Sequence, residues 1–191
     1  GGGNTNNHLV SSFLEFNGHF YASFENVNEG MNIWRTNNGL NWTQVSVNGF
    51  GDANNIYAGG LGKFDGYLYI GTRNNTTGAQ LWRSSNGTIW HQVIGDGFGD
   101  LNNTKIDSAV SFNNALYVAT YNDATGMEVW RSDDGLNFVQ VNRDGFDGNN
   151  MYSLWSSGTA VFQNKLYMGT KNINDDAGGG VWVSAPSQGA F

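Results

Sequence analysis

Aromatic-rich segments recur along this chain at a constant interval, and this periodicity restricts the folds that the sequence can adopt. Trp34, Trp82 and Trp130 are evenly spaced, and an arginine follows each of them. We call their spacing the repeat length. The same spacing relates further aromatic residues and glycines: Phe16, Phe64 and Phe112; Tyr21, Tyr69 and Tyr117; Gly39, Gly87 and Gly135; Trp42, Trp90 and Phe138. A less regular fourth copy carries Phe162, Tyr167 and Trp182. A catalytic group is normally needed once, so residues present in every copy are expected to be structural.

Each copy contains the pattern of four short strands. In the third copy, alternating apolar residues and turn signals predict strands at residues 106–112, 115–121, 127–132 and 137–141. Four antiparallel strands repeated every 40 to 50 residues or so are typical of propeller blades, which must stack to bury their apolar faces. We therefore predict an all-β fold, a β-propeller of four blades of roughly 48 residues in a single domain, residues 1–191. The blades are expected at about residues 8–47, 56–94, 106–142 and 151–191.

The last blade is expected to lack its outer strand, because the sequence reaches Phe191 where that strand should begin. The preceding strand would then be an unpaired edge, which is a template for another strand. The chain is accordingly predicted to be a four-blade propeller, or a four-blade portion of a larger propeller or assembly. A homo-oligomer formed through the open last blade is one expected arrangement.

The turns after the tryptophans resemble a known motif. The segments RTNNGLNW, RSSNGTIW and RSDDGLNF, which begin at Arg35, Arg83 and Arg131, resemble the Asp boxes of sialidase-type β-propellers. Asp134 lies at the expected offset from Ser132, but the following glycine and aromatic residue come one residue early. In the first two copies asparagine replaces the aspartate. The resemblance implies the propeller fold, and it says little about activity because Asp boxes occur in enzymes and non-enzymes.

The arginines argue against a sialidase. Sialidases use three arginines to bind the substrate carboxylate, whereas three of the five arginines here belong to the repeat. Arg73 and Arg143 remain, which is too few for that triad. A sialidase-like glycosidase is therefore kept as a remote alternative, and the chain is predicted not to be an enzyme.

Composition excludes several classes of partner. The net charge of −7 and the pI of about 4.6 argue against nucleic acid and anionic membranes. The chain has no cysteine, which excludes disulfides and thiolate metal sites. Its apolar runs are too short for insertion into a membrane. No cofactor is predicted, apart from the calcium considered next.

Acidic residues and asparagines gather in the loops between the second and third strands and in the connections between blades. These segments share one face of a propeller, so ligand binding is expected on that face. Its connections repeat the pattern Asp-x-Asn: Asp52 and Asn54, Asp100 and Asn102, Asp147 and Asn149. Such oxygens suit Ca²⁺. The favoured interpretation is that they close Asx turns over their own backbone, which needs no metal.

Trp155 is the one tryptophan that lies outside the repeat positions. It falls in an insertion at the innermost strand of the fourth blade, whose second loop is also enlarged. We predict that it stacks against a saccharide, and a core position is the alternative. The candidate ligand-binding residues are Arg143, Tyr152, Trp155, Asn172, Asp175 and Asp176.

These observations lead to a functional hypothesis. The chain is predicted to be a non-catalytic, secreted, extracellular or cell-surface binding module that recognises a saccharide or glycan, as a lectin does. The alternative is a structural repeat protein that assembles with copies of itself into a fibre, a ring or a surface layer.

Overall fold

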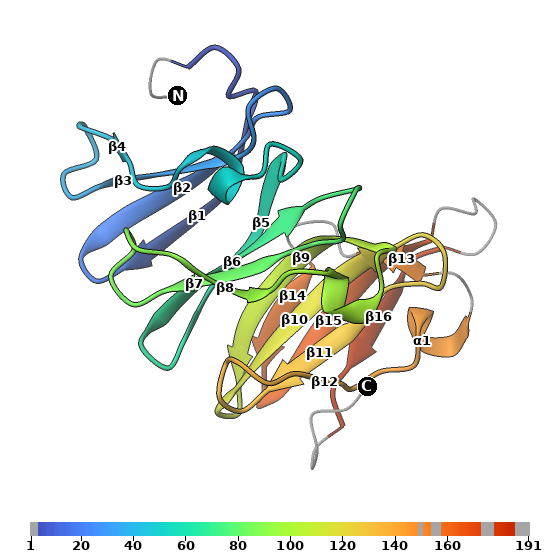
Figure 1. The fold of residues 1–191 in the computed structure, drawn as a ribbon. Coiled ribbons are helices and arrows are strands. Elements are labelled where there is room, and N and C mark those ends of the chain that lie inside the picture. The colour runs from blue at the N-terminus through green and yellow to red at the C-terminus, as the bar shows by residue number, and fades with distance from the viewer. Residues whose placement is uncertain (1–3, 149–150, 154–157, 173–177, 186–191) are drawn as a thin grey trace.

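The computed structural model describes residues 4–148, 151–153, 158–172 and 178–185. Over these residues the protein is built almost entirely of antiparallel strands that form a series of twisted sheets (Figure 1). Short helical turns occur in the connections between sheets: Asn48–Gly51, Gly97–Gly99 and α1 (Gly145–Gly148). Within the described part of the chain, no helix is long and apolar enough to cross a membrane.

The first repeat forms a sheet of its own, in which the strands pair in sequence order. Its strands are β1 (Leu9–Phe16), β2 (His19–Glu25), β3 (Asn32–Thr36) and β4 (Thr43–Gln44). The register places Tyr21 opposite Arg35 and Ala22 opposite Trp34. Alternation along β2 and β3 therefore puts Tyr21 and Ile33 on one face and Ala22 and Trp34 on the other.

The second and third repeats have the same strand order. The second contains β5 (Tyr57–Phe64), β6 (Tyr67–Arg73), β7 (Leu81–Ser84) and β8 (His91–Ile94). The third contains β9 (Asn103–Phe112), β10 (Ala115–Asn122), β11 (Val129–Ser132) and β12 (Val139–Gln140). A single pairing between Arg73 and Lys105 joins the two sheets. All four strands predicted in the third repeat are present.

The fourth repeat departs from this pattern at its innermost strand. Its strands are β13 (Met151–Ser153), β14 (Thr159–Phe162), β15 (Lys165–Asn172) and β16 (Gly180–Val183). Both β13 and β14 pair with β15, one toward each end of that strand. Two short segments thus replace one inner strand, at the place where the sequence predicted an insertion. The predicted loss of the outer strand concerns residues 186–191, which lie outside the described residues.

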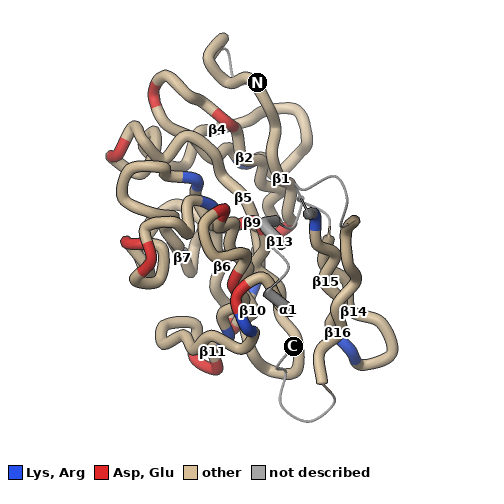
Figure 2. Tube along the Cα trace, turned by 90° about the vertical axis from the view of Figure 1, so that its right-hand side faces the viewer, with Lys and Arg blue, Asp and Glu red and all other residues tan. Residues whose placement is uncertain are grey.

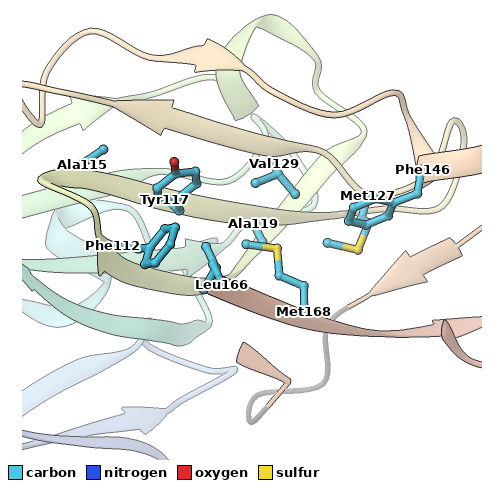
Figure 3. Packing of buried hydrophobic residues seen from close by; sticks show 9 residues of the cluster. All are labelled: Phe112, Ala115, Tyr117, Ala119, Met127, Val129, Phe146, Leu166 and Met168. Carbon is cyan, nitrogen blue, oxygen red and sulfur yellow. The ribbon is translucent and has the colours of Figure 1, made fainter. Parts of the chain in front are cut away.

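Consecutive sheets bury their apolar faces against each other. We call the face of a sheet that packs on the following repeat its rear face. The rear face of the third sheet includes Tyr117, Met127 and Val129, and it packs on Leu166 and Met168 of the fourth sheet (Figure 3). Equivalent clusters join the first sheet to the second and the second to the third. The repeated aromatic residues thus fill the spaces between sheets, as predicted. The prediction of an all-β fold of the propeller type is confirmed.

A phenylalanine in each connection stacks on the tryptophan of the next sheet. The ring centroids are 4.4 Å apart for Phe50 and Trp82, 4.7 Å for Phe98 and Trp130, and 4.5 Å for Phe146 and Trp182. All three phenylalanines have positive φ, between 54° and 65°. A bulky residue rarely adopts this conformation. The stacking interaction therefore stabilises a strained turn at the same place in three successive repeats.

Candidate functional site

The predicted ligand-binding residues fall in the fourth repeat and just before it. Arg143 is exposed, and its carbonyl oxygen accepts hydrogen bonds from Phe146 N (2.7 Å) and Asn142 Nδ2 (2.8 Å). Tyr152 lies in β13 and Asn172 at the end of β15, and these strands pair through Met151 and Asn172. Trp155, Asp175 and Asp176 lie outside the described residues. The predicted saccharide contacts of this group stay a prediction.

The Asp-x-Asn connections form Asx turns. Asp52 Oδ1 accepts hydrogen bonds from both the backbone N and the Nδ2 of Asn54, each at 2.9 Å. Asp100 makes the same two contacts with Asn102. Of the third pair, Asp147 lies in α1 and Asn149 falls outside the described residues. Among the residues that the structure describes, no three acidic or histidine side chains are grouped to hold a metal ion. Calcium binding stays untested.

The acidic side chains of these turns also hold the neighbouring loops. Asp52 Oδ2 accepts a hydrogen bond from Asn74, and Asp100 Oδ2 accepts one from Asn122, both at 2.9 Å. In the second and third repeats, the loop that follows the second strand is thereby joined to the connection that precedes the first strand. Figure 2 shows acidic residues in loops near β4, β7 and β11.

A chain of buried amides extends this network into the second sheet. In the second repeat, Asn74 donates to Asn55 Oδ1 (3.1 Å), and Asn55 donates to Gln80 Oε1 (2.8 Å). The same Gln80 oxygen accepts a hydrogen bond from Trp82 Nε1 (3.0 Å). This structural role was not predicted, although asparagines that recur at the repeat length are visible in the sequence. Much of the polarity on the loop face therefore stabilises the protein.

Glu128 replaces the amide in the third repeat. Its Oε2 accepts hydrogen bonds from Asn103 (2.7 Å) and Trp130 Nε1 (2.9 Å), as Gln80 does in the second repeat. The side chain is buried, and this burial raises the pKa of the Glu128 carboxyl. The hydrogen bonds from Asn103 and Trp130 partly oppose that rise.

A cleft of about 910 Å³ opens on the other face of the molecule, between the hairpin turns of the first three repeats. It is lined by residues 15–17, 63–67 and 111–114, together with Asp133. The turns are tight because their central residues, such as Asn17 and Gly18, have positive φ, as two-residue hairpins require. Three hairpins thus place acidic, amide and aromatic side chains around one opening.

The cleft carries a fixed pattern of charge. Glu15 accepts hydrogen bonds from Gly18 N (3.0 Å) and Lys63 Nζ (3.3 Å), and these contacts lower the pKa of the Glu15 carboxyl. Asp133 binds the Arg131 guanidinium, with Nη1 to Oδ2 at 2.9 Å, and this contact raises the pKa of Arg131. Asp65 is exposed in the turn of the second hairpin.

Aromatic and amide groups complete the cleft. Tyr67 is half-buried, and the Arg83 guanidinium lies 4.3 Å from the centre of its ring. Asn17, Asn113 and Asn114 contribute amides from two hairpins. Aromatic rings and neutral hydrogen-bonding groups around carboxyl groups form a surface that suits a saccharide.

Comparison with known proteins places the fold. No protein-family model matches the chain, and no curated protein matches it. Solved structures do match. A GH32 β-fructofuranosidase mutant from Bombyx mori in complex with sucrose has a TM-score of 0.56 and 13% identity, with 92% of this chain and 46% of that chain covered. The fold shared with this structure is of the β-propeller type.

Two further structures agree. A GH43 α-L-arabinofuranosidase from Clostridium thermocellum has a TM-score of 0.54 and 12% identity, covering 94% of this chain and 70% of that chain. GH43B of a Bacteroides ovatus xyloglucan locus has a TM-score of 0.53 and 12% identity, covering 96% and 40%. The chain spans less than half the length of the GH32 and GH43B proteins. At these identities the likeness shows the fold, which in these neighbours is of the five-bladed propeller type.

These structures correct the predicted function. The chain was expected to be a non-catalytic binding module and not an enzyme, yet the matched propellers are glycoside hydrolases. The expected binding site on the loop face stays a prediction, and the cleft among the hairpin turns is a separate candidate. Hydrogen bonds from Asn74 to Asp52 and from Asn122 to Asp100 join loops and connections on the loop face.

Proposed function

We propose that this chain belongs to a glycoside hydrolase and that the hairpin cleft binds the saccharide. The observation that carries the proposal is the convergence of Glu15, Asp65 and Asp133, one from each of the first three repeats, on one cleft. Glycosidic bonds are commonly hydrolysed between two carboxyl groups, of which one donates a proton while the other acts as base or nucleophile. The fold's likeness to glycoside hydrolases supports this choice.

The surroundings of the three carboxyl groups suggest separate roles. Glu15 is held ionised by Lys63 and Gly18 N, so it is assigned as the base or nucleophile. Asp133 is engaged by Arg131, so its carboxylate is assigned to binding. Asp65 is the remaining carboxyl group of the cleft and is assigned as the partner of Glu15 in the catalytic pair. Tyr67 is assigned to contact the sugar ring.

Aryl glycosides with a chromogenic leaving group test this proposal. We expect hydrolysis of at least one substrate in a panel of neutral pyranosides and furanosides. The substitutions Glu15→Gln and Asp65→Asn should each lower kcat by about 10²-fold or more. Asp123→Asn is the matched control, since Asp123 is an exposed carboxylate outside the cleft and its loss should leave kcat unchanged. Full activity in the Glu15→Gln variant would exclude this assignment.

Two finer points belong to the same proposal. We infer that the turns between the third and fourth strands are degenerate Asp boxes, because Asp134 Oδ1 accepts hydrogen bonds from Leu136 N (2.9 Å) and Asn137 N (2.8 Å).

An extracellular or cell-surface location is compatible with action on a polymeric saccharide, and it stays a prediction.

A further inference from the structure

The contacts between consecutive sheets reuse the same positions. On the front face, which we define as the face of a sheet that packs on the preceding repeat, the second sheet uses Ala58, Leu61, Leu68 and Ile70. The third sheet uses Ile106, Ala109, Leu116 and Val118, each one repeat length later. The interface is therefore a property of the repeat, and every sheet with apolar residues at these positions is built to receive a neighbour.

The first sheet has apolar residues at these positions and leaves three of them exposed. The residues one repeat length earlier are Val10, Phe13, Phe20 and Ala22. Phe13 is 55% exposed and Phe20 is 42% exposed, whereas their counterparts Leu61 and Leu68 are 9% and 0% exposed. The rings of Phe13 and Phe20 stack at a centroid distance of 5.2 Å, which joins them into one apolar surface. A patch of this kind marks an interaction site.

Trp34 gives a second indication. Its counterparts Trp82, Trp130 and Trp182 each stack on a phenylalanine from the preceding connection. The position one repeat length before Phe50 is Gly2, which has no ring to offer. The ring contact of Trp34 is instead an edge contact with Phe24 of its own sheet, at 6.5 Å.

We propose that the front face of the first repeat binds one further β-blade of this repeat type. The rear face of that blade would supply a tyrosine and aliphatic residues to Phe13 and Phe20, as Tyr21 and Ile33 do for the second repeat. The five-bladed type of the matched propellers agrees with one additional blade. This blade is inferred independently of the proposed hydrolase activity.

A fusion protein tests the proposal. A copy of residues 56–103 would replace residues 1–7, so that its final residue, Asn103, takes the place of Asn7 in the repeat. We expect the Tm to rise by at least about 5 °C and the fluorescence of a dye that binds apolar surface to fall at least about twofold. The same fusion with Leu81→Asp in the added copy alone should give neither change. An unchanged Tm and unchanged dye binding in the first fusion would overturn the proposal.

Substitutions in the full chain provide the second test. The double variant Phe13→Ser and Phe20→Ser should bind less dye at an unchanged Tm, because both rings are exposed. Leu61→Ser and Leu68→Ser, at the buried counterparts, should lower the Tm sharply. Light scattering that shows a dimer dissociated by the Phe13 and Phe20 substitutions would make a second copy the occupant and overturn the proposal. Loss of saccharide binding in that variant would also overturn it.

Discussion

Glu128 stands at a position that the first two repeats fill with the amides Asn32 and Gln80. Its hydrogen bonds are those of Gln80, since Asn103 and Trp130 donate to it as Asn55 and Trp82 donate to Gln80. A neutral acceptor would satisfy both donors equally well. The ionised carboxylate adds the cost of placing a charge in a buried site.

Replacing Glu128 with glutamine should make the protein more stable at neutral pH. Burial raises the carboxyl pKa above its ordinary value of 4.5, so the folded state binds the proton more tightly than the unfolded state. The free energy of unfolding of the native protein therefore falls as the pH rises above about 4.5. The Glu128→Gln variant should lose this decline and gain about 1 kcal/mol at pH 7.

Urea unfolding at several pH values measures this effect. Gln80→Glu supplies the reciprocal control, because it places a carboxyl in the equivalent site of the second repeat and should create the same decline. Parallel pH profiles for the native protein and the Glu128→Gln variant would contradict the explanation.

At the scale of the element, the turns between the third and fourth strands of the second and third repeats contact a tyrosine of the preceding sheet. The turns after β7 and β11 contain Gly87 and Gly135 at φ of 72° and 70°, and a Cβ at either would collide with the hydroxyl of Tyr21 or Tyr69. Tyr69 Oη also donates to Gly135 O at 3.2 Å. The recurrence of glycine at these positions thus has two causes, the backbone conformation and the tyrosine of the neighbouring sheet.

Phe146→Ala should destabilise the protein by about 3 kcal/mol. The ring of Phe146 is 7% exposed and stacks on Trp182, and alanine would keep the strained positive φ while losing that contact. Thermal unfolding of the variant measures the loss. Leu136→Ala is the control, because Leu136 is 47% exposed and its truncation should change the Tm little. Similar melting of both variants would show that the stack contributes nothing.

The elements were predictable where the repeat was regular. Strand positions in the third repeat followed from alternation, and the roles of Tyr117 and Trp130 followed from their constant spacing. The positive φ of Phe98 was not predictable, because phenylalanine disfavours it and contacts with the rings of Trp130 and Phe138 compensate for it. The hairpin cleft was missed because two-residue turns give no sign in sequence that three of them surround an opening.

For the molecule as a whole, the close approach of the inner strands β1, β5 and β9 sets how the sheets are arranged. Strand β5 carries Gly59, Gly60 and Gly62, and a Cβ at Gly62 would meet the backbone oxygen and side chain of Ala109 in β9. Gly62 does not have positive φ, so its backbone conformation does not require glycine. Glycine is needed because a side chain would collide with β9. The short distance between strands leaves no room for larger side chains at these positions.

Gly62→Ala should therefore destabilise the protein by about 1 to 3 kcal/mol through overpacking. Differential scanning calorimetry would measure the change. Gly169→Ala is the matched control in β15, where an added Cβ would meet its nearest neighbour at an ordinary 3.7 Å. Equal Tm values for the two variants would show that β5 and β9 can separate without cost.

The stacking of each connection phenylalanine on the following tryptophan also affects the order in which the molecule forms. A growing chain emerges from the ribosome with its amino end first, so the rear face of each sheet stays bare until the next repeat has been made. Release after Asn103 would leave Tyr69, Leu81 and Phe98 without the third sheet that covers them. Each repeat thus covers the apolar face of the repeat before it. A truncated product is expected to aggregate through the exposed apolar face of the sheet that was synthesised last.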